Sequence, residues 1–151
     1  MVRTMRVIFL FFIVNLLLLG CIAKNDKKDR FNFEKILDNI LVDVNYTKEV
    51  SFNKNELDVS TIFVKVEDDK NKFKEKFERL VNKEKFIKVE SLFVDQDVYC
   101  YDKKNEIKIT LPKKQLYKNE NGNTMEIDKE NLDKVIITYR YNMYGTTSCD
   151  K

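Results

Sequence analysis

The chain has 151 residues, enough for one domain, with 28 Lys and Arg, 25 Asp and Glu and no His. The lack of histidine excludes Ser-His-Asp and Cys-His catalytic sites and His-based zinc sites, and three glycines are too few for a glycine-rich phosphate-binding loop. Basic and acidic residues are mixed along the chain, whereas nucleic-acid binders usually have a basic bias, so we expect no nucleic-acid partner. We also predict no cofactor and no bound metal.

The first 20 residues have the features of an export signal. Arg3 and Arg6 precede an apolar run over residues 7–19, which is shorter than the roughly 20 residues of a membrane-spanning helix. The run ends in Leu18-Leu19-Gly20-Cys21, which resembles the lipobox of bacterial lipoproteins. This resemblance implies cleavage before Cys21 and an acyl-lipid anchor on that cysteine. The alternative is a plain secretory signal that happens to contain a cysteine.

The mature chain would begin with a polar segment. Loss of Arg3 and Arg6 leaves 26 basic residues (28 minus 2) against 25 acidic ones, a net charge of +1. Residues 21–30 are charged and poor in apolar side chains, so we expect a flexible tether between the lipid and a single domain over residues 31–151. The resemblance places the protein in the cell envelope. Ile22 favours the outer membrane in a Gram-negative host, and a Gram-positive host would carry the protein on the outer face of the cell membrane.

Two segments of the domain have the apolar spacing of an amphipathic helix. The first is predicted to begin near Asn32 as N-cap, and the second near Asp68 or Asp69. The apolar residues of the first are Phe33, Ile36, Leu37, Ile40, Leu41 and Val44, and those of the second are Phe73, Phe77, Leu80 and Val81.

Alternation of apolar and polar residues predicts strands over residues 60–66, 86–94, 98–101, 107–111 and 135–141. Shorter strands are expected near residues 50–52, 116–117 and 125–127. Residues 102–105 and Asn121-Gly122 have the composition of hairpin turns, and residues 128–133 that of one helical turn. This order predicts an α+β fold, with an antiparallel sheet of about five to six strands and two helices packed on one face.

Two cysteines remain after Cys21, namely Cys100 and Cys149. An even number in an exported domain favours a disulfide, and the alternative is a buried free thiol at Cys100. Among the acidic residues, Asp95 and Asp97 have the Asp-x-Asp spacing of some metal and sugar sites, although a polar turn is the favoured interpretation.

Five tyrosines concentrate near two of the predicted strands: Tyr99, Tyr101, Tyr139, Tyr141 and Tyr144. Tyrosine is enriched at protein interfaces, so we predict a partner-binding surface there, with ordinary core packing as the alternative. The resulting hypothesis is a non-enzymatic envelope lipoprotein that binds another envelope or exported protein, as inhibitors, immunity proteins or accessory subunits do. The alternatives are a carboxylate-based cell-wall glycan hydrolase and a lipoprotein that binds a small ligand such as a lipid or sugar.

Overall fold

The computed structural model describes residues 29–150, so the predicted signal peptide and Cys21 lie outside the described residues. The helices are α2 (Glu34–Ile40) and α3 (Lys70–Lys83), with a 3₁₀ turn η2 (Lys129–Asn131). The strands of the main sheet are β1 (Tyr46–Asn53), β2 (Leu57–Val64), β3 (Ile87–Val89), β4 (Gln96–Cys100), β5 (Asn105–Thr110) and β8 (Val135–Asn142). A separate hairpin consists of β6 (Leu116–Lys118) and β7 (Thr124–Glu126).

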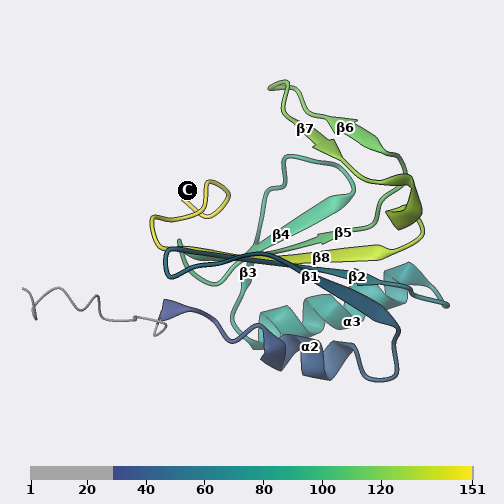
Figure 1. Cartoon of the computed structure of the whole chain (residues 1–151), viewed down its shortest axis with the longest axis horizontal. Coiled ribbons are helices and arrows are strands. Elements are labelled where there is room, and N and C mark those ends of the chain that lie inside the picture. The colour runs from purple at the N-terminus through teal and green to yellow at the C-terminus, as the bar shows by residue number, and fades with distance from the viewer. Residues whose placement is uncertain (1–28, 151) are drawn as a thin grey trace, which may run out of the picture.

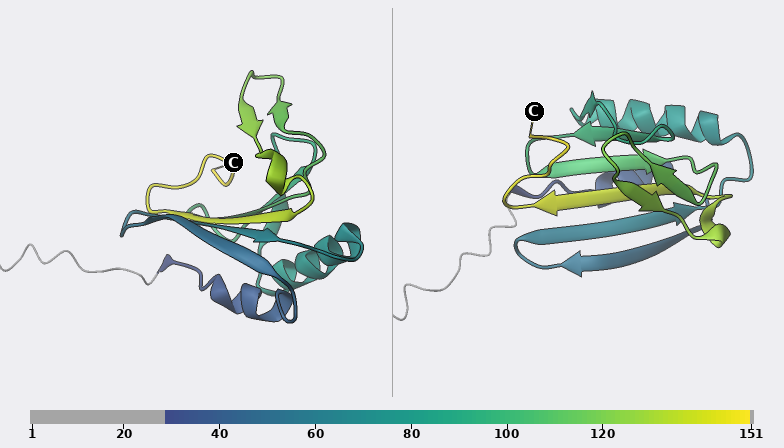
Figure 2. Two further views of the ribbon diagram at one scale, coloured as in Figure 1. Left: turned by 45° about the vertical axis from the view of Figure 1, so that its right-hand side comes forward. Right: turned by 90° about the horizontal axis from the view of Figure 1, so that it is seen from above.

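The fold is α+β, as predicted. The main sheet has six antiparallel strands in the order β1-β2-β8-β5-β4-β3, and both helices cover one of its faces (Figure 1). The opposite face carries the β6–β7 hairpin and the C-terminal segment (Figure 2). None of the helices within residues 29–150 is long and apolar enough to cross a membrane.

The core lies between the sheet and the helices. β8 alternates strictly between buried and half-buried residues, and its buried side chains meet the helix-facing side chains of β2 and β5 in register, as in the row Ile62–Ile137–Ile109. From the other side, α2 contributes Ile36, Leu37 and Ile40 and α3 contributes Phe73, Phe77 and Val81. These helical residues are those that the apolar periodicity predicted to lie on one face.

The helix termini confirm one of the predicted N-caps. The Asp69 carboxylate accepts a hydrogen bond from the backbone N–H of Asn71 at 2.8 Å, which caps α3. The prediction of Asn32 as the cap of α2 was wrong: the N-cap position is Phe33, which has no side-chain capping bond. α2 also ends at Ile40, earlier than its apolar pattern predicted, and Asp43 just beyond it has a positive φ of 60° that interrupts a helix.

Most turn predictions are confirmed. Asp102 accepts backbone hydrogen bonds from Lys104 and Asn105 in the β4–β5 turn, and Gly122 supplies the positive φ of 79° in the β6–β7 turn. Two strand predictions need correction. The strand expected over residues 86–94 is only β3, and the short strand near residues 50–52 is the eight-residue β1, whose residues are all exposed.

The predicted disulfide is present in the structure. Cys100, in β4, and Cys149 are joined, with their Cα atoms 5.7 Å apart. The C-terminal segment therefore lies against the sheet face opposite the helices.

The two ends of the sheet differ in what they carry. One end, which we call the Asp29 end, holds Asp29, the β1–β2 turn, the β4–β5 turn and the turn after β8 (Figures 1 and 2). The tether prediction needs a small correction here, because the side chains of Asp29 and Arg30 contact the domain through Lys104 and Asp58. The opposite end holds the start of β4 and the end of β5, where Gln96 pairs with Thr110.

Candidate partner-binding surface

Three of the five predicted surface tyrosines lie in the core, so the prediction was wrong for them. Tyr99, Tyr139 and Tyr141 are buried. Tyr99 packs edge-on against Phe77 of α3, and Tyr139 stacks on Phe33 with ring centroids 5.1 Å apart. These side chains share the face of the sheet that the helices cover, which is why they cannot reach a partner.

Burial also changes the acidity of two of these tyrosines. Removal from water raises the pKa of the Tyr99 and Tyr139 hydroxyls above the usual value, because the phenolate would be poorly solvated. The Tyr139 hydroxyl donates a hydrogen bond to Asn105 Oδ1 at 2.7 Å. Both residues therefore remain neutral parts of the core.

The other two tyrosines are exposed and lie at the Asp29 end. Tyr101 follows β4 and contacts the rings of Phe31 and Phe86, at centroid distances of 5.3 and 5.4 Å. Tyr144 lies in the turn after β8 and is 80% exposed. The structure therefore does not bring the five tyrosines together on one surface.

Asp95 and Asp97 do not form a carboxylate pair. Asp97 lies toward the helices, where its Oδ2 is 2.6 Å from Lys74 Nζ and 3.1 Å from Lys88 Nζ. Burial alone would raise the pKa of the Asp97 carboxyl, but the two ammonium groups outweigh burial and hold the pKa below its usual value.

Asp95 faces the other side, toward the β6–β7 hairpin. Its carboxylate pairs with Lys113 Nζ at 2.9 Å and accepts a hydrogen bond from the Tyr117 hydroxyl at 3.0 Å. The hydrogen bond from Lys113 holds the pKa of Asp95 below its usual value, against the opposing effect of burial. Within residues 29–150 no three His, Cys, Asp or Glu side chains are grouped so that they could hold a metal ion.

One acid that the sequence patterns did not single out is buried. Glu106 in β5 is 1% exposed, and its Oε1 is 3.1 Å from Lys108 Nζ. Its register neighbours are Cys100 and Arg140, so it lies beside the disulfide on the face that carries the C-terminal segment. Glu106 alternates with the apolar Ile107 and Ile109, and no motif in the sequence distinguishes it from the exposed acids.

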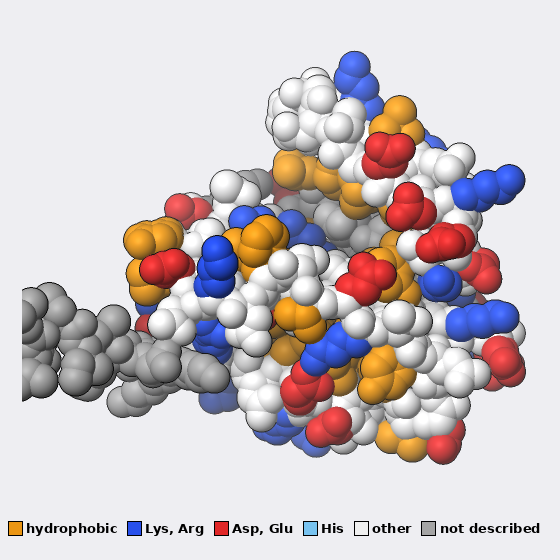
Figure 3. Space-filling model, viewed as in Figure 1, with side chains coloured by type: hydrophobic (Ala, Val, Ile, Leu, Met, Phe, Trp, Pro, Cys, Tyr) orange, Lys and Arg blue, Asp and Glu red, His pale blue; other side chains and the backbone are white. Residues whose placement is uncertain are grey.

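An exposed apolar surface lies at the end of the sheet opposite the Asp29 end. In the loop of residues 90–95, Leu92 is 55% and Val94 96% exposed, and Leu116 at the start of β6 is 58% exposed. A groove of about 390 Å³ between this loop and the hairpin is lined by Leu92, Val94 and Tyr117, among others. We call Leu92 and Val94 the loop surface. In the space-filling view, hydrophobic side chains are visible at the base of the projecting hairpin (Figure 3).

The loop is held in place by its odd-numbered residues. Ser91 and Phe93 exchange hydrogen bonds between the Ser91 hydroxyl and the Phe93 backbone, and the Phe93 ring contacts that of Tyr117 edge-on. Asp95 binds Tyr117 through its side chain, and its carbonyl accepts from the Leu111 N–H at 2.9 Å. Since residues 91, 93 and 95 are engaged, Leu92 and Val94 are left to face solvent.

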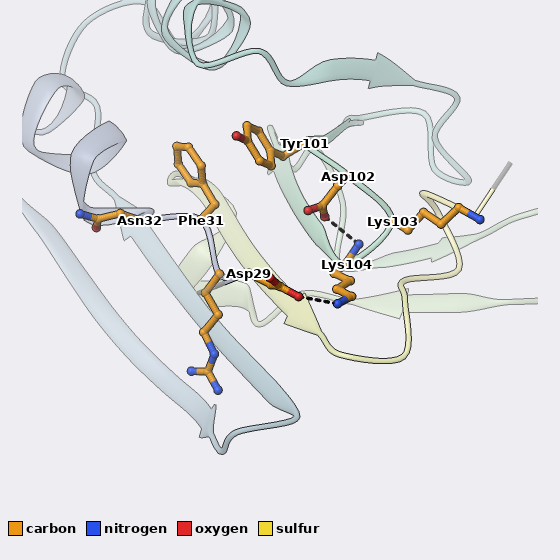
Figure 4. Close-up of a pocket in the computed structure, with 8 residues that line it drawn as sticks. Asp29, Phe31, Asn32, Tyr101, Asp102, Lys103 and Lys104 are labelled. Carbon is orange, nitrogen blue, oxygen red and sulfur yellow. Dashed lines mark hydrogen bonds and ion pairs between the residues drawn. The ribbon is translucent and has the colours of Figure 1, made fainter. Parts of the chain in front are cut away.

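Two further hollows lie elsewhere on the domain. The larger, of about 560 Å³, is at the Asp29 end between residues 29–32 and the β4–β5 turn (Figure 4). The smaller, of about 230 Å³, lies between β7 and the sheet and is lined by polar residues such as Thr61, Gln96 and Thr138 together with Met125.

Comparisons with known proteins do not assign this chain to a family. No protein-family model, curated protein or solved structure matches it. The functional argument therefore rests on the residues and the geometry described above.

Proposed function

We propose that the protein is a lipid-anchored, non-enzymatic envelope protein that binds another protein through the loop surface. The lipobox-like sequence Leu18-Leu19-Gly20-Cys21 supports the anchor. The observation that carries the binding proposal is the exposure of Leu92 and Val94 on a loop whose neighbouring side chains are fixed.

The energetics favour this surface as a binding site. Burial of a Val or Leu side chain contributes about 1.5–3 kcal/mol, so the two exposed aliphatic side chains, Leu92 and Val94, are a substantial unused source of affinity. The hydrogen bonds of Ser91 and Asp95 already order the loop in the free protein. A partner would therefore lose little conformational entropy when it binds this surface.

The acidic residues support binding over glycan hydrolysis. A glycosidase of the usual kind needs two carboxyl groups about 5–9.5 Å apart across a cleft, one of which can donate a proton. Asp95 and Asp97 face opposite sides and pair with lysines. In the hollow at the Asp29 end, Asp29 pairs with Lys104, and Asp102 accepts the backbone hydrogen bonds of its turn.

A small-ligand role has less support than protein binding. The hollow of about 560 Å³ is large enough for a small molecule. However, five of its eight lining residues are charged, namely Asp29, Arg30, Asp102, Lys103 and Lys104, whereas sites for small molecules are mostly apolar.

The binding proposal is tested with the protein as extracted from the membrane, used as bait for the envelope fraction of the host. Val94→Asp should weaken capture of a stoichiometric protein partner at least tenfold, because it places a charge in the buried centre of the interface. Val42→Asp is the matched control, since Val42 is also more than half exposed but lies beyond α2.

A second variant, Val50→Asp, tests whether the partner binds the free edge of the sheet instead of the loop surface. β1 is an edge strand with Val50 and Phe52 about half exposed, and such an edge can also accept a partner strand. If Val50→Asp abolishes capture of the partner while Val94→Asp retains it, the interface lies on β1 and not on the loop surface. Absence of any protein partner from correctly folded bait would shift the assignment to a glycan or small ligand.

The anchor has its own test. The intact mass of the protein extracted from membranes should correspond to a chain that begins at Cys21 and carries added acyl chains. A full-length mass without modification would contradict the anchor while leaving the binding surface open to its separate test.

A further inference from the structure

The point at which the chain enters the domain is fixed by a buried amide. The side chain of Asn105 is fully buried, accepts a hydrogen bond from the Phe31 N–H at 3.0 Å and donates one to the Asp29 carbonyl at 2.9 Å. Lys104 Nζ lies 2.7 Å from the Asp29 carboxylate, as the dashed line in Figure 4 shows. Residue 29 therefore has a defined position beside the β4–β5 turn.

Arg30 ties the same segment to the β1–β2 hairpin. Its guanidinium donates to the Lys54 carbonyl, pairs with Asp58 at 3.2 Å and stacks over the ring of Tyr141 at 5.0 Å. Two turns of the sheet therefore hold residues 29 and 30.

The turn after β8 lies at this same end. The Met143 N–H donates to the Glu56 carbonyl at 2.8 Å, and the Asn142 N–H donates to the Lys104 carbonyl at 2.9 Å. Met143 and Tyr144 are nevertheless 40% and 80% exposed. The Lys103 side chain is 78% exposed and extends away from the other residues drawn in Figure 4, and its Nζ lies 3.7 Å from the carboxylate of Asp150, which is also exposed.

The length of the preceding segment limits how far this end can be from the anchor. Cys21 and Asp29 are eight residues apart in the sequence, and eight extended residues span at most about 28 Å. If Cys21 carries lipid, as proposed above, the Asp29 end is the part of the domain held nearest to the bilayer.

We infer that the Asp29 end lies on the lipid head groups of the membrane that holds Cys21, with Met143 and Tyr144 in the interfacial layer and Lys103 beside anionic head groups. Tyrosine is well suited to this layer because its ring is apolar and its hydroxyl is polar. Lysine is attracted to anionic lipid over a distance of about one Debye length. The anchor keeps these side chains at high effective concentration near the membrane, so individually weak contacts suffice.

The chain contains no tryptophan, so a single tryptophan can report on the depth of each end. The full lipidated protein with Tyr144→Trp is reconstituted into vesicles of phosphatidylcholine and phosphatidylglycerol that contain a lipid with a quencher near the head group. The matched control is Val94→Trp, which places a tryptophan at a position of the loop surface that is also largely exposed. We expect the Tyr144→Trp emission to be quenched several-fold more strongly than that of Val94→Trp.

A charge reversal adds a second measurement. Lys103→Glu in the Tyr144→Trp protein should reduce quenching in vesicles with phosphatidylglycerol and leave it unchanged in pure phosphatidylcholine. Lys118→Glu on β6, at the other end of the molecule, should have no effect in either.

The quenching and flotation results distinguish failure of this inference from failure of the lipid anchor. Protein that floats with the vesicles but shows equal quenching in the two tryptophan variants would overturn the inference alone. Protein that does not float with vesicles has no working lipid anchor, and both the anchor and this inference would then be wrong.

Discussion

Asp97 is the residue for which the structure makes the clearest pH prediction. Lys74 and Lys88 hold the pKa of its carboxyl below the usual value, so the ionised carboxylate stabilises the folded state. This stabilisation is complete above the unfolded pKa of about 3.9 and is lost as the pH falls through the lower folded pKa. Asp97→Asn should therefore lower the free energy of unfolding at pH 7, and its difference from the wild type should shrink below about pH 4.

The measurement is denaturant unfolding of the two proteins across the acid range. Asp38→Asn on the exposed side of α2 serves as the control substitution. A loss of stability in Asp97→Asn that is the same at pH 7 and pH 2 would show that packing, and not the two ion pairs, is responsible.

The tyrosines show what a sequence pattern cannot decide at the scale of a residue. Alternation in β8 correctly places Tyr139 and Tyr141 on the same face as Val135 and Ile137. Whether that face is buried depends on which side of the sheet the helices cover, and a local sequence pattern does not predict this. The apolar neighbours on that face were the available signal for core packing, and Tyr144 lies beyond the alternating segment.

The N-terminus of α3 allows a prediction at the scale of an element. Asp68 and Asp69 are adjacent acids, and Asp69 is the one at the N-cap position, with an extended backbone and a hydrogen bond from the Asn71 N–H. Asp69→Ala should lower the free energy of unfolding by about 1 kcal/mol, because the Asn71 N–H loses its acceptor.

Asp68→Ala is the matched control, since it removes an acid from the same region without removing the cap. We expect its effect on thermal or denaturant unfolding to be at most a few tenths of a kcal/mol, as for ordinary surface substitutions. Equal losses in the two variants would assign the effect to the charge of the acids near the helix N-terminus.

The elements differ in how far the sequence could predict them. α3 and β8 were predicted closely because each buries one face against the core, which imposes a period on the apolar residues. β1 is exposed along all eight residues and forms by pairing with β2, so it has no burial pattern from which to be found. β3 is shorter than predicted because the chain leaves the sheet after Val89. Of the apolar residues that follow, Leu92 and Val94 are exposed and Phe93 contacts Tyr117 of the hairpin.

At the scale of the whole molecule, the sheet places the two proposed contacts, with a partner protein and with the membrane, at its opposite ends. The strands of β2 and β8 pair over eight residues, which corresponds to about 26 Å of sheet. The proposed membrane contact lies at the end with Asp29 and Tyr144, and the loop surface lies at the opposite end. A partner could therefore bind Val94 without displacing the domain from the bilayer, and the two proposals are compatible on one anchored molecule.

The disulfide concerns the stability of the whole domain. Cys100 is in the sheet and Cys149 near the C-terminus, 49 residues apart in sequence. In the chain-entropy model, closing a loop of this length destabilises the unfolded chain by about 4 kcal/mol, because it removes conformational entropy.

The double variant Cys100→Ser/Cys149→Ser should therefore lose about 4 kcal/mol of the free energy of unfolding, measured in denaturant. Reductant should lower the stability of the wild type to a similar extent and leave the double variant unchanged. The wild type is also unfolded and refolded in reductant. If its free energy of unfolding does not change, the cross-link contributes nothing to stability. The C-terminal segment is then held by its backbone hydrogen bonds to Glu56 and Lys103.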